Sequence, residues 1–227
     1  MDERRSWGSL LLFAVAMAWM EAATVFYLRV LIDRVEPYQP QPLPVSVGLG
    51  RAELLREAAT LIMLWSVGRL AGSTSRSRLG YSMAAFGLWD ILYYVFLRAL
   101  GPWPRSVWDW DVLFLLPLPW WGPVLAPVAI AALMVVTGAL LTRRAAGRAA
   151  WTAALAGAVL ALGVFMADSL AALPSGPDAV RNVLPSQFHW GSFLLALGLL
   201  SLPAWDMALP RRGPFLSGLP FTSRDAA

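Results

Sequence analysis

Six long apolar stretches constrain this chain most, because each is about as long as a helix that crosses a lipid bilayer. They cover residues 8–31, 53–71, 80–100, 121–142, 151–173 and 188–209, near the ~20 apolar residues that a spanning helix needs. The sequence therefore predicts an all-α fold, a polytopic membrane bundle of about six transmembrane helices. We expect one transmembrane domain over residues 1–212 and a short cytoplasmic tail over 213–227.

The composition supports a membrane protein and excludes several kinds of site. Hydrophobic residues make up 58% of the 227 residues and charged residues 14%, whereas an average soluble domain carries roughly 25% charged residues. Cysteine is absent, which excludes disulfide bonds, thiolate metal sites and cysteine nucleophiles. Lysine is absent as well, which excludes Schiff-base chemistry. The arginines are scattered rather than gathered in a tract, so we expect no nucleic-acid partner.

The arginines predict the orientation of the chain. The first apolar stretch continues past Glu21, which is too long for a signal peptide, so we expect a retained helix. With the N-terminus inside, the inner loops and helix ends hold eleven arginines and the outer ones hold seven. The positive-inside rule then places both termini in the cytoplasm. Both termini lie on the same side only if the number of spans is even. That number depends on the least apolar stretch, 53–71, which begins with Glu53, Arg56 and Glu57.

Residues 101–123 stand apart from the apolar stretches because they hold five tryptophans and five prolines. This Trp/Pro-rich segment is too short and too broken to span a bilayer, so we expect an outer interfacial or re-entrant segment. Tryptophan rings favour the headgroup level of a membrane. We therefore predict interfacial anchors, with aromatic ligand binding as the alternative, at Trp103, Trp108, Trp110, Trp120 and Trp121.

An aspartate lies in the middle of the third stretch, where a charge costs roughly 2.5–3.5 kcal/mol on insertion scales. Residues four apart share a face of a helix, so Asp90, Tyr94 and Arg98 are predicted to form one stripe. Glu21 and Arg29 repeat the eight-residue spacing in the first stretch. The position of Asp90 therefore indicates a polar pocket or an ion-pair network inside the helical bundle.

Other ionisable residues approach from the same outer side. The full set of candidates for an outward-facing polar pocket is Glu21, Arg29, Glu57, Asp90, Tyr94, Arg98, Asp168 and His189. Two interpretations stay open. The charges can form ion pairs that fix how the helices pack, or they can form a site for a ligand, a proton or a substrate.

Known catalytic motifs do not choose between these interpretations. With one histidine, no cysteine and no Glu-x-x-His motif, we expect no metal site. Ser186 and Ser192 lie near His189 but not in a Gly-x-Ser-x-Gly motif, and no glycine-rich phosphate loop is present. No motif indicates a cofactor, so its identity stays unknown.

Four strings resemble a family of small bacterial multi-pass membrane proteins whose activity is uncharacterised. They are EAATVFYLR (21–29), REAATLIMLWSVGRLAG (56–72), FGLWDILYYVFLR (86–98) and WDWDVLFLLPLPWWGPVLAPV (108–128). The resemblance covers roughly residues 20–130. It implies a bacterial cytoplasmic (inner) membrane location, and it carries no activity and no site residues.

The leading functional hypothesis is a binding or accessory module with a periplasm-facing polar pocket. Its expected partners are the lipid bilayer and either a partner membrane protein or a lipid-like or quinone-like small molecule, lined by aromatic side chains and buried acids. The alternative is a membrane-embedded enzyme or a proton-linked transporter, with Glu21 and Asp90 as its buried carboxylates.

Overall fold

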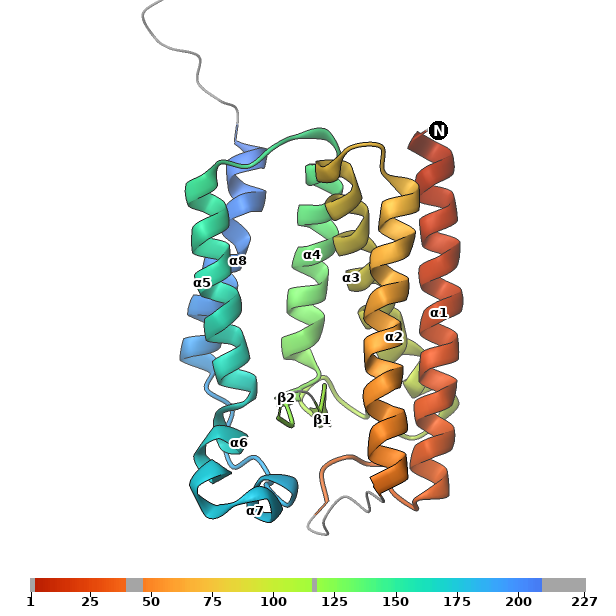
Figure 1. The fold of residues 1–227 in the computed structure, drawn as a ribbon, viewed down its shortest axis with the longest axis vertical. Helices are drawn as coiled ribbons and strands as arrows, with labels where there is room; N and C mark the ends of the chain where they lie inside the picture. Colours follow the sequence, from red (N-terminus) through yellow and green to blue (C-terminus); the bar gives the residue numbers. More distant parts are fainter. Residues whose placement is uncertain (1–2, 40–46, 116–117, 210–227) are drawn as a thin grey trace, which may run out of the picture.

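The computed structural model describes residues 3–39, 47–115 and 118–209, and these residues are mostly helical. The long helices run side by side with alternating directions (Figure 1): α1 (Glu3–Leu31), α2 (Val47–Ala71), α3 (Ser75–Leu100), α4 (Leu125–Arg143), α5 (Arg148–Phe165) and α8 (Trp190–Ala208). Both described ends lie at one end of the bundle, here called the terminal end. The predicted tail, 213–227, lies outside the described residues.

The short elements gather at the other end of the bundle, here called the hairpin end (Figure 1). They are β1 (Trp110–Val112), β2 (Trp121–Pro123), α6 (Ala167–Ala172), a 3₁₀ turn (Leu173–Ser175) and α7 (Pro177–Arg181). The two strands pair antiparallel, with Trp110 opposite Pro123 and Val112 opposite Trp121. Residues 101–124, which contain both strands, are called the hairpin segment below.

Within the described residues, five helices are long and apolar enough to cross a membrane: α1, α3, α4, α5 and α8. The helical bundle and the membrane character predicted from the sequence are therefore confirmed at this level. The sixth predicted span corresponds to α2, which also runs along the bundle but carries Arg56, Glu57 and Arg69. It is outside this set of five.

Helices α1, α2 and α3 begin five or six residues before their predicted spans, and two other predicted spans do not form a single helix. Residues 121–123 form β2 rather than the start of a helix, and α4 begins at Leu125. Proline explains this boundary, because Pro127 would lie in the interior of a helix that began at Trp121 and would leave one of its hydrogen bonds unmade. In α4, Pro127 lies in the first turn, where no donor is needed. The predicted span 151–173 is also divided. Helix α5 ends at Phe165, and α6 follows after Met166.

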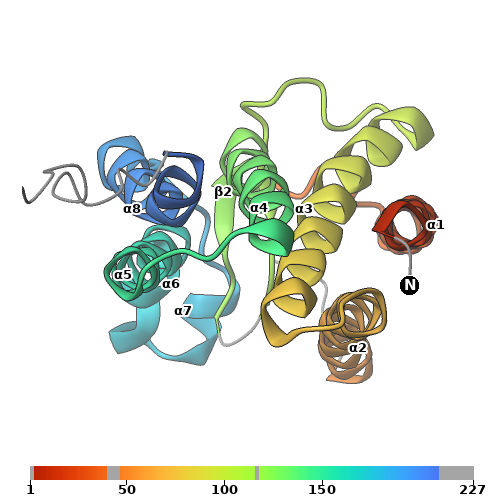
Figure 2. The ribbon, with the colours of Figure 1, turned by 90° about the horizontal axis from the view of Figure 1, so that it is seen from above.

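Helix α3 lies at the centre of one group of helices, and α5 packs on α8 at the side of that group (Figure 2). Helix α3 contacts α1, α2 and α4, and α4 also contacts α8. Glycines allow the close approach of α3 and α4, because a Cβ atom at Gly138 would lie 2.4 Å from the Gly80 carbonyl oxygen. A Cβ atom at Gly157 of α5 would lie 2.8 Å from the Ala196 oxygen of α8, as expected for a small-residue ridge.

Side chains fix the loops at the terminal end. The Thr74 and Ser77 side chains form a capping box at the start of α3. Between α4 and α5, the Gly147 amide donates to the Asp206 carboxylate of α8 at 2.5 Å, and Arg144 donates to the Met207 carbonyl at 2.6 Å. These contacts hold α8 against the α4–α5 loop.

The glycine contact between α3 and α4 predicts the effect of one added methyl group. Gly138→Ala should lower the free energy of unfolding by about 1–3 kcal/mol, because the new atom would overlap the α3 backbone. The matched control is Gly163→Ala in α5, where a Cβ atom meets nothing within 4 Å, so its stability should be unchanged or slightly raised. Thermal unfolding in detergent checks both variants, and equal effects would contradict the packing described here.

Candidate functional site

A cavity of about 510 Å³ lies between the two groups of helices. Side chains of α1, α2, α3, α4, α5 and the hairpin segment line it, with one further residue from α8. Its volume falls within the ~300–1,000 Å³ of small-molecule sites in proteins. The cavity is therefore large enough to hold a ligand.

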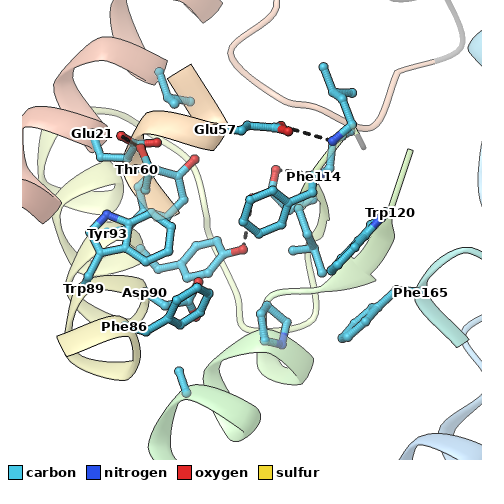
Figure 3. Close-up of a pocket in the computed structure, with 18 of the residues that line it drawn as sticks. Glu21, Glu57, Thr60, Phe86, Trp89, Asp90, Tyr93, Phe114, Trp120 and Phe165 are labelled. Atoms are coloured by element: carbon cyan, nitrogen blue, oxygen red, sulfur yellow. Dashed lines mark hydrogen bonds between the residues drawn. The ribbon is translucent and has the colours of Figure 1, made fainter. Parts of the chain in front are cut away.

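Most of the cavity wall is apolar and aromatic. Phe86 and Trp89 of α3 lie on one side of the view in Figure 3, and Trp120 and Phe165 lie on the other. The Trp120 and Phe165 rings are stacked with centroids 6.5 Å apart. Further apolar lining residues are Met83, Leu113, Phe114, Ile130, Met134 and Leu162. This wall favours an apolar or aromatic ligand over a strongly hydrated one.

A buried ion pair joins the hairpin segment to α1 and α3. Arg29 donates to the Asp111 carboxylate at 2.8 Å, and Tyr94 donates to its other oxygen at 3.1 Å. The Asp111 side chain is 1% exposed, and the Arg29 guanidinium lies 4.3 Å from the centroid of the Trp103 ring. Burial raises the pKa of the Asp111 carboxyl, and the charge of Arg29 opposes that rise.

A second polar group joins α2 to α1 and to the hairpin segment. Arg56 forms ion pairs with Glu21 of α1 and with Glu53 of its own helix. Thr60 donates to Glu21 at 3.2 Å, and Glu57 accepts a hydrogen bond from the Leu115 amide at 3.1 Å (Figure 3). The polar part of the cavity is thus built from three elements that are far apart in the sequence.

Asp90 lines the same cavity but has no hydrogen-bond or ion-pair partner in the described part of the chain. Its Oδ2 atom is buried, and the Glu57 Oε2 atom and the indole nitrogens of Trp89 and Trp120 are also buried without a partner. Buried polar groups are normally hydrogen-bonded, since an unpaired one costs free energy. The Nη1 atom of Arg29 is also buried without a hydrogen-bond partner, and the Nη1 atom of Arg56 has only its ion pair with Glu21. The wall therefore presents two carboxylate acceptors, two indole donors and two guanidinium nitrogens that form no hydrogen bond with the described residues.

The structure brings together five of the candidates predicted from the sequence: Glu21, Arg29, Glu57, Asp90 and Tyr94. Arg98, Asp168 and His189 are not part of the cavity lining. Arg98 is exposed in the last turn of α3 and donates to the Gly101 carbonyl. The spacing does not explain this, because Glu21 and Arg29 are also eight residues apart and both line the cavity. Asp168 lies in α6 near Ser186, and His189 is exposed at the start of α8.

The tryptophans predicted as interfacial anchors occupy three kinds of place. Trp103 and Trp121 are only 4% and 3% exposed, so the anchor prediction is corrected for both: they pack inside the protein. Trp110 and Trp120 are half-buried, and Trp120 lines the cavity. Trp108 is 61% exposed and is the member of the set whose exposure fits an anchor at the membrane surface.

Four charged residues of the site are not in the set of eight candidates predicted from the sequence: Arg34, Glu53, Arg56 and Asp111. Asp111 follows Trp110 in a segment without helical periodicity, so no face-sharing rule connects it to Arg29. The sequence signal that could have identified Asp111 is the charge of Arg29, which needs an acidic partner from one of the outer segments. Arg56 stands at the start of the least apolar span, where an arginine is ordinarily taken for a helix-end charge.

Among the described residues, no three side chains of histidine, aspartate or glutamate come close enough together to hold a metal ion. Comparisons with protein-family models, with curated proteins and with solved structures find no match to this chain. The resemblance to a family of small bacterial membrane proteins stays a prediction. The cavity is therefore the feature from which the function of this protein can be inferred.

The buried ion pair predicts a large loss of stability when its charge is removed. Asp111→Asn should lower the free energy of unfolding by about 3–5 kcal/mol, because it leaves Arg29 buried without a counter-charge. Thermal unfolding in detergent measures the change. The matched control is Glu36→Gln, which removes an exposed partner of Arg105 and should cost less than about 1 kcal/mol. Similar losses in the two variants would contradict a structural role for the Asp111 carboxylate.

Proposed function

We propose that this protein binds one lipid-like amphiphile in the cavity between its helices. The observation that carries the proposal is the composition of the cavity wall: a large aromatic and apolar surface that also contains buried carboxylates and guanidinium groups. An amphiphile matches both parts, with its chain against the apolar wall and its head group at the polar residues.

The arrangement of the helices supports entry from the bilayer. Helices α2 and α5 stand apart from each other, on the same side of α4 (Figures 1 and 2). All three helices contribute residues to the lining of the cavity. Helices α2 and α5 both carry exposed apolar side chains, such as Ile62 on α2 and Leu155 on α5. A molecule dissolved in the membrane would reach the cavity sideways, between α2 and α5.

We further propose that α2 is the sixth membrane span and that the hairpin end faces the periplasm of a bacterial inner membrane. An even number of spans places the start of the first helix and the end of the last helix on the same side of the membrane. Glu3 and Ala208 do lie at the same end of the bundle (Figure 1). Two arginines of the outer set, Arg29 and Arg56, are engaged in ion pairs inside the protein. The excess of arginines in the segments at the terminal end supports a cytoplasmic terminal end.

The contacts favour a binding role over the alternative of an enzyme or proton-linked transporter. That alternative uses Glu21 and Asp90 together as buried carboxylates. Glu21 is already bound by Arg56 and Thr60, whereas Asp90 is without a described partner. The two acids therefore have different surroundings, and Asp90 is the one that is free to meet a ligand.

Native mass spectrometry of the protein, extracted gently from its own membranes, tests the proposal. We expect one chain with one small molecule of lipid-like mass bound to it. A stoichiometric partner chain with no small molecule would contradict the proposal and favour an accessory subunit. A bare chain after gentle extraction would contradict it too.

Filling the cavity should abolish this binding. Ala158 of α5 lines the cavity, and Ala158→Trp should reduce the fraction of chains that retain the small molecule at least about tenfold, since the ring would occupy the space for its chain. The matched control is Val159→Trp, because the neighbouring Val159 is 63% exposed on the outer face of the same helix. Equal retention by the two variants in native mass spectrometry would place the bound molecule outside the cavity.

A further inference from the structure

We infer that the head group of the bound amphiphile carries a protonated amine, and that Asp90 is its main contact. This inference rests on the proposed function, because it names the class of molecule that the cavity takes. It depends on three independent features of the cavity: the balance of charge, the missing partner of Asp90 and the aromatic rings beside Asp90.

The charges that line the cavity are out of balance. Five carboxylates and three guanidinium groups belong to the lining: Glu21, Glu53, Glu57, Asp90 and Asp111, against Arg29, Arg34 and Arg56. Arg29 is paired with Asp111, and Arg56 is paired with Glu21 and Glu53. Asp90 and Glu57 form none of the ion pairs of the described residues. A cation brought by the ligand would restore the balance of charge among these side chains.

The chemistry of Asp90 selects a donor rather than an acceptor. An ionised carboxylate only accepts hydrogen bonds, and an ammonium group only donates them. The buried Oδ2 atom of Asp90 lacks a donor, and an amine in the cavity would supply one. A phosphate or carboxylate head group would accept hydrogen bonds from the Nη1 atoms of Arg29 and Arg56. It would, however, add negative charge to a lining with five carboxylates and three guanidinium groups, and it would leave Asp90 unpaired. A quinone carbonyl would satisfy the indole donors of Trp89 or Trp120 and leave Asp90 unpaired.

Aromatic rings surround the position of Asp90 on α3. Trp89 stacks on Tyr93 with ring centroids 6.2 Å apart, and Phe86 meets Trp89 edge-on at 5.3 Å. These rings lie on the same side of the cavity as Asp90 (Figure 3). The face of an aromatic ring attracts a cation, most strongly that of tryptophan. A carboxylate beside such rings is a favourable site for an alkylammonium group, which is ionised at pH 7 because amines of this kind have pKa values near 10.

Three probes with the same chain length test the head group. Dodecylamine, 1-dodecanol and dodecanoate are titrated into the purified full-length protein in a non-ionic maltoside detergent, and the tryptophan fluorescence of the cavity reports binding. We expect dodecylamine to bind at least about tenfold more tightly than the other two, as a charge-assisted hydrogen bond requires. Asp90→Asn should remove this advantage and leave the affinity for 1-dodecanol unchanged. The control Asp168→Asn, an acid outside the cavity, should change neither.

The outcomes separate this inference from the proposed function. Equal affinities for dodecylamine and 1-dodecanol, or tightest binding of dodecanoate, would overturn the amine head group and leave an amphiphile cavity in place. No binding of any probe, together with no effect of Ala158→Trp on the native molecule, would overturn both. The ranking of the three probes on the unaltered protein is decisive even if Asp90→Asn fails to fold.

Discussion

The buried ion pair between Arg29 and Asp111 is the contact on which the shape of this protein depends. It binds the hairpin segment to α1, and the hydrogen bond from Tyr94 extends the contact to α3. A buried pair of this kind adds little stability compared with apolar side chains, but the loss of one partner is costly. Its effect is therefore positional: it holds the hairpin segment among the helices at one end of the cavity, where Trp120 becomes part of the wall.

The charged residues of the cavity are of two kinds. Some form ion pairs that fix the packing of the helices, and one is available to bind a ligand. Arg29, Arg56 and their carboxylate partners connect separate helices, which is the behaviour of residues that fix helix packing. Asp90 connects nothing in the described part of the chain, although a charge in a span is expensive and usually serves a function. The same cavity thus combines a structural network with one acid that is free to bind a ligand.

The sequence predicts the helices well because hydropathy and length follow directly from the thickness of a bilayer. It also predicts Asp90, because a mid-span charge is conspicuous in any apolar stretch. It does not predict Asp111, since the partner of Arg29 lies in a segment whose pairing depends on proline positions and long-range contacts rather than on periodicity. Arg98 lies outside the cavity lining because this residue is in the last turn of α3, where its side chain donates to the Gly101 carbonyl. An eight-residue spacing alone does not decide the outcome, since Glu21 and Arg29 share it and both line the cavity.

An amphiphile held between the helices with its head group at Asp90 should be visible in a structure of the protein with its native lipids. The measurement to make is cryo-electron microscopy of the protein in nanodiscs made from its own membrane lipids. We expect elongated density between α2 and α5 that ends within hydrogen-bond distance of the Asp90 carboxylate. A cavity without density, or one closed by direct contact of α2 with α5, would show that no amphiphile binds there.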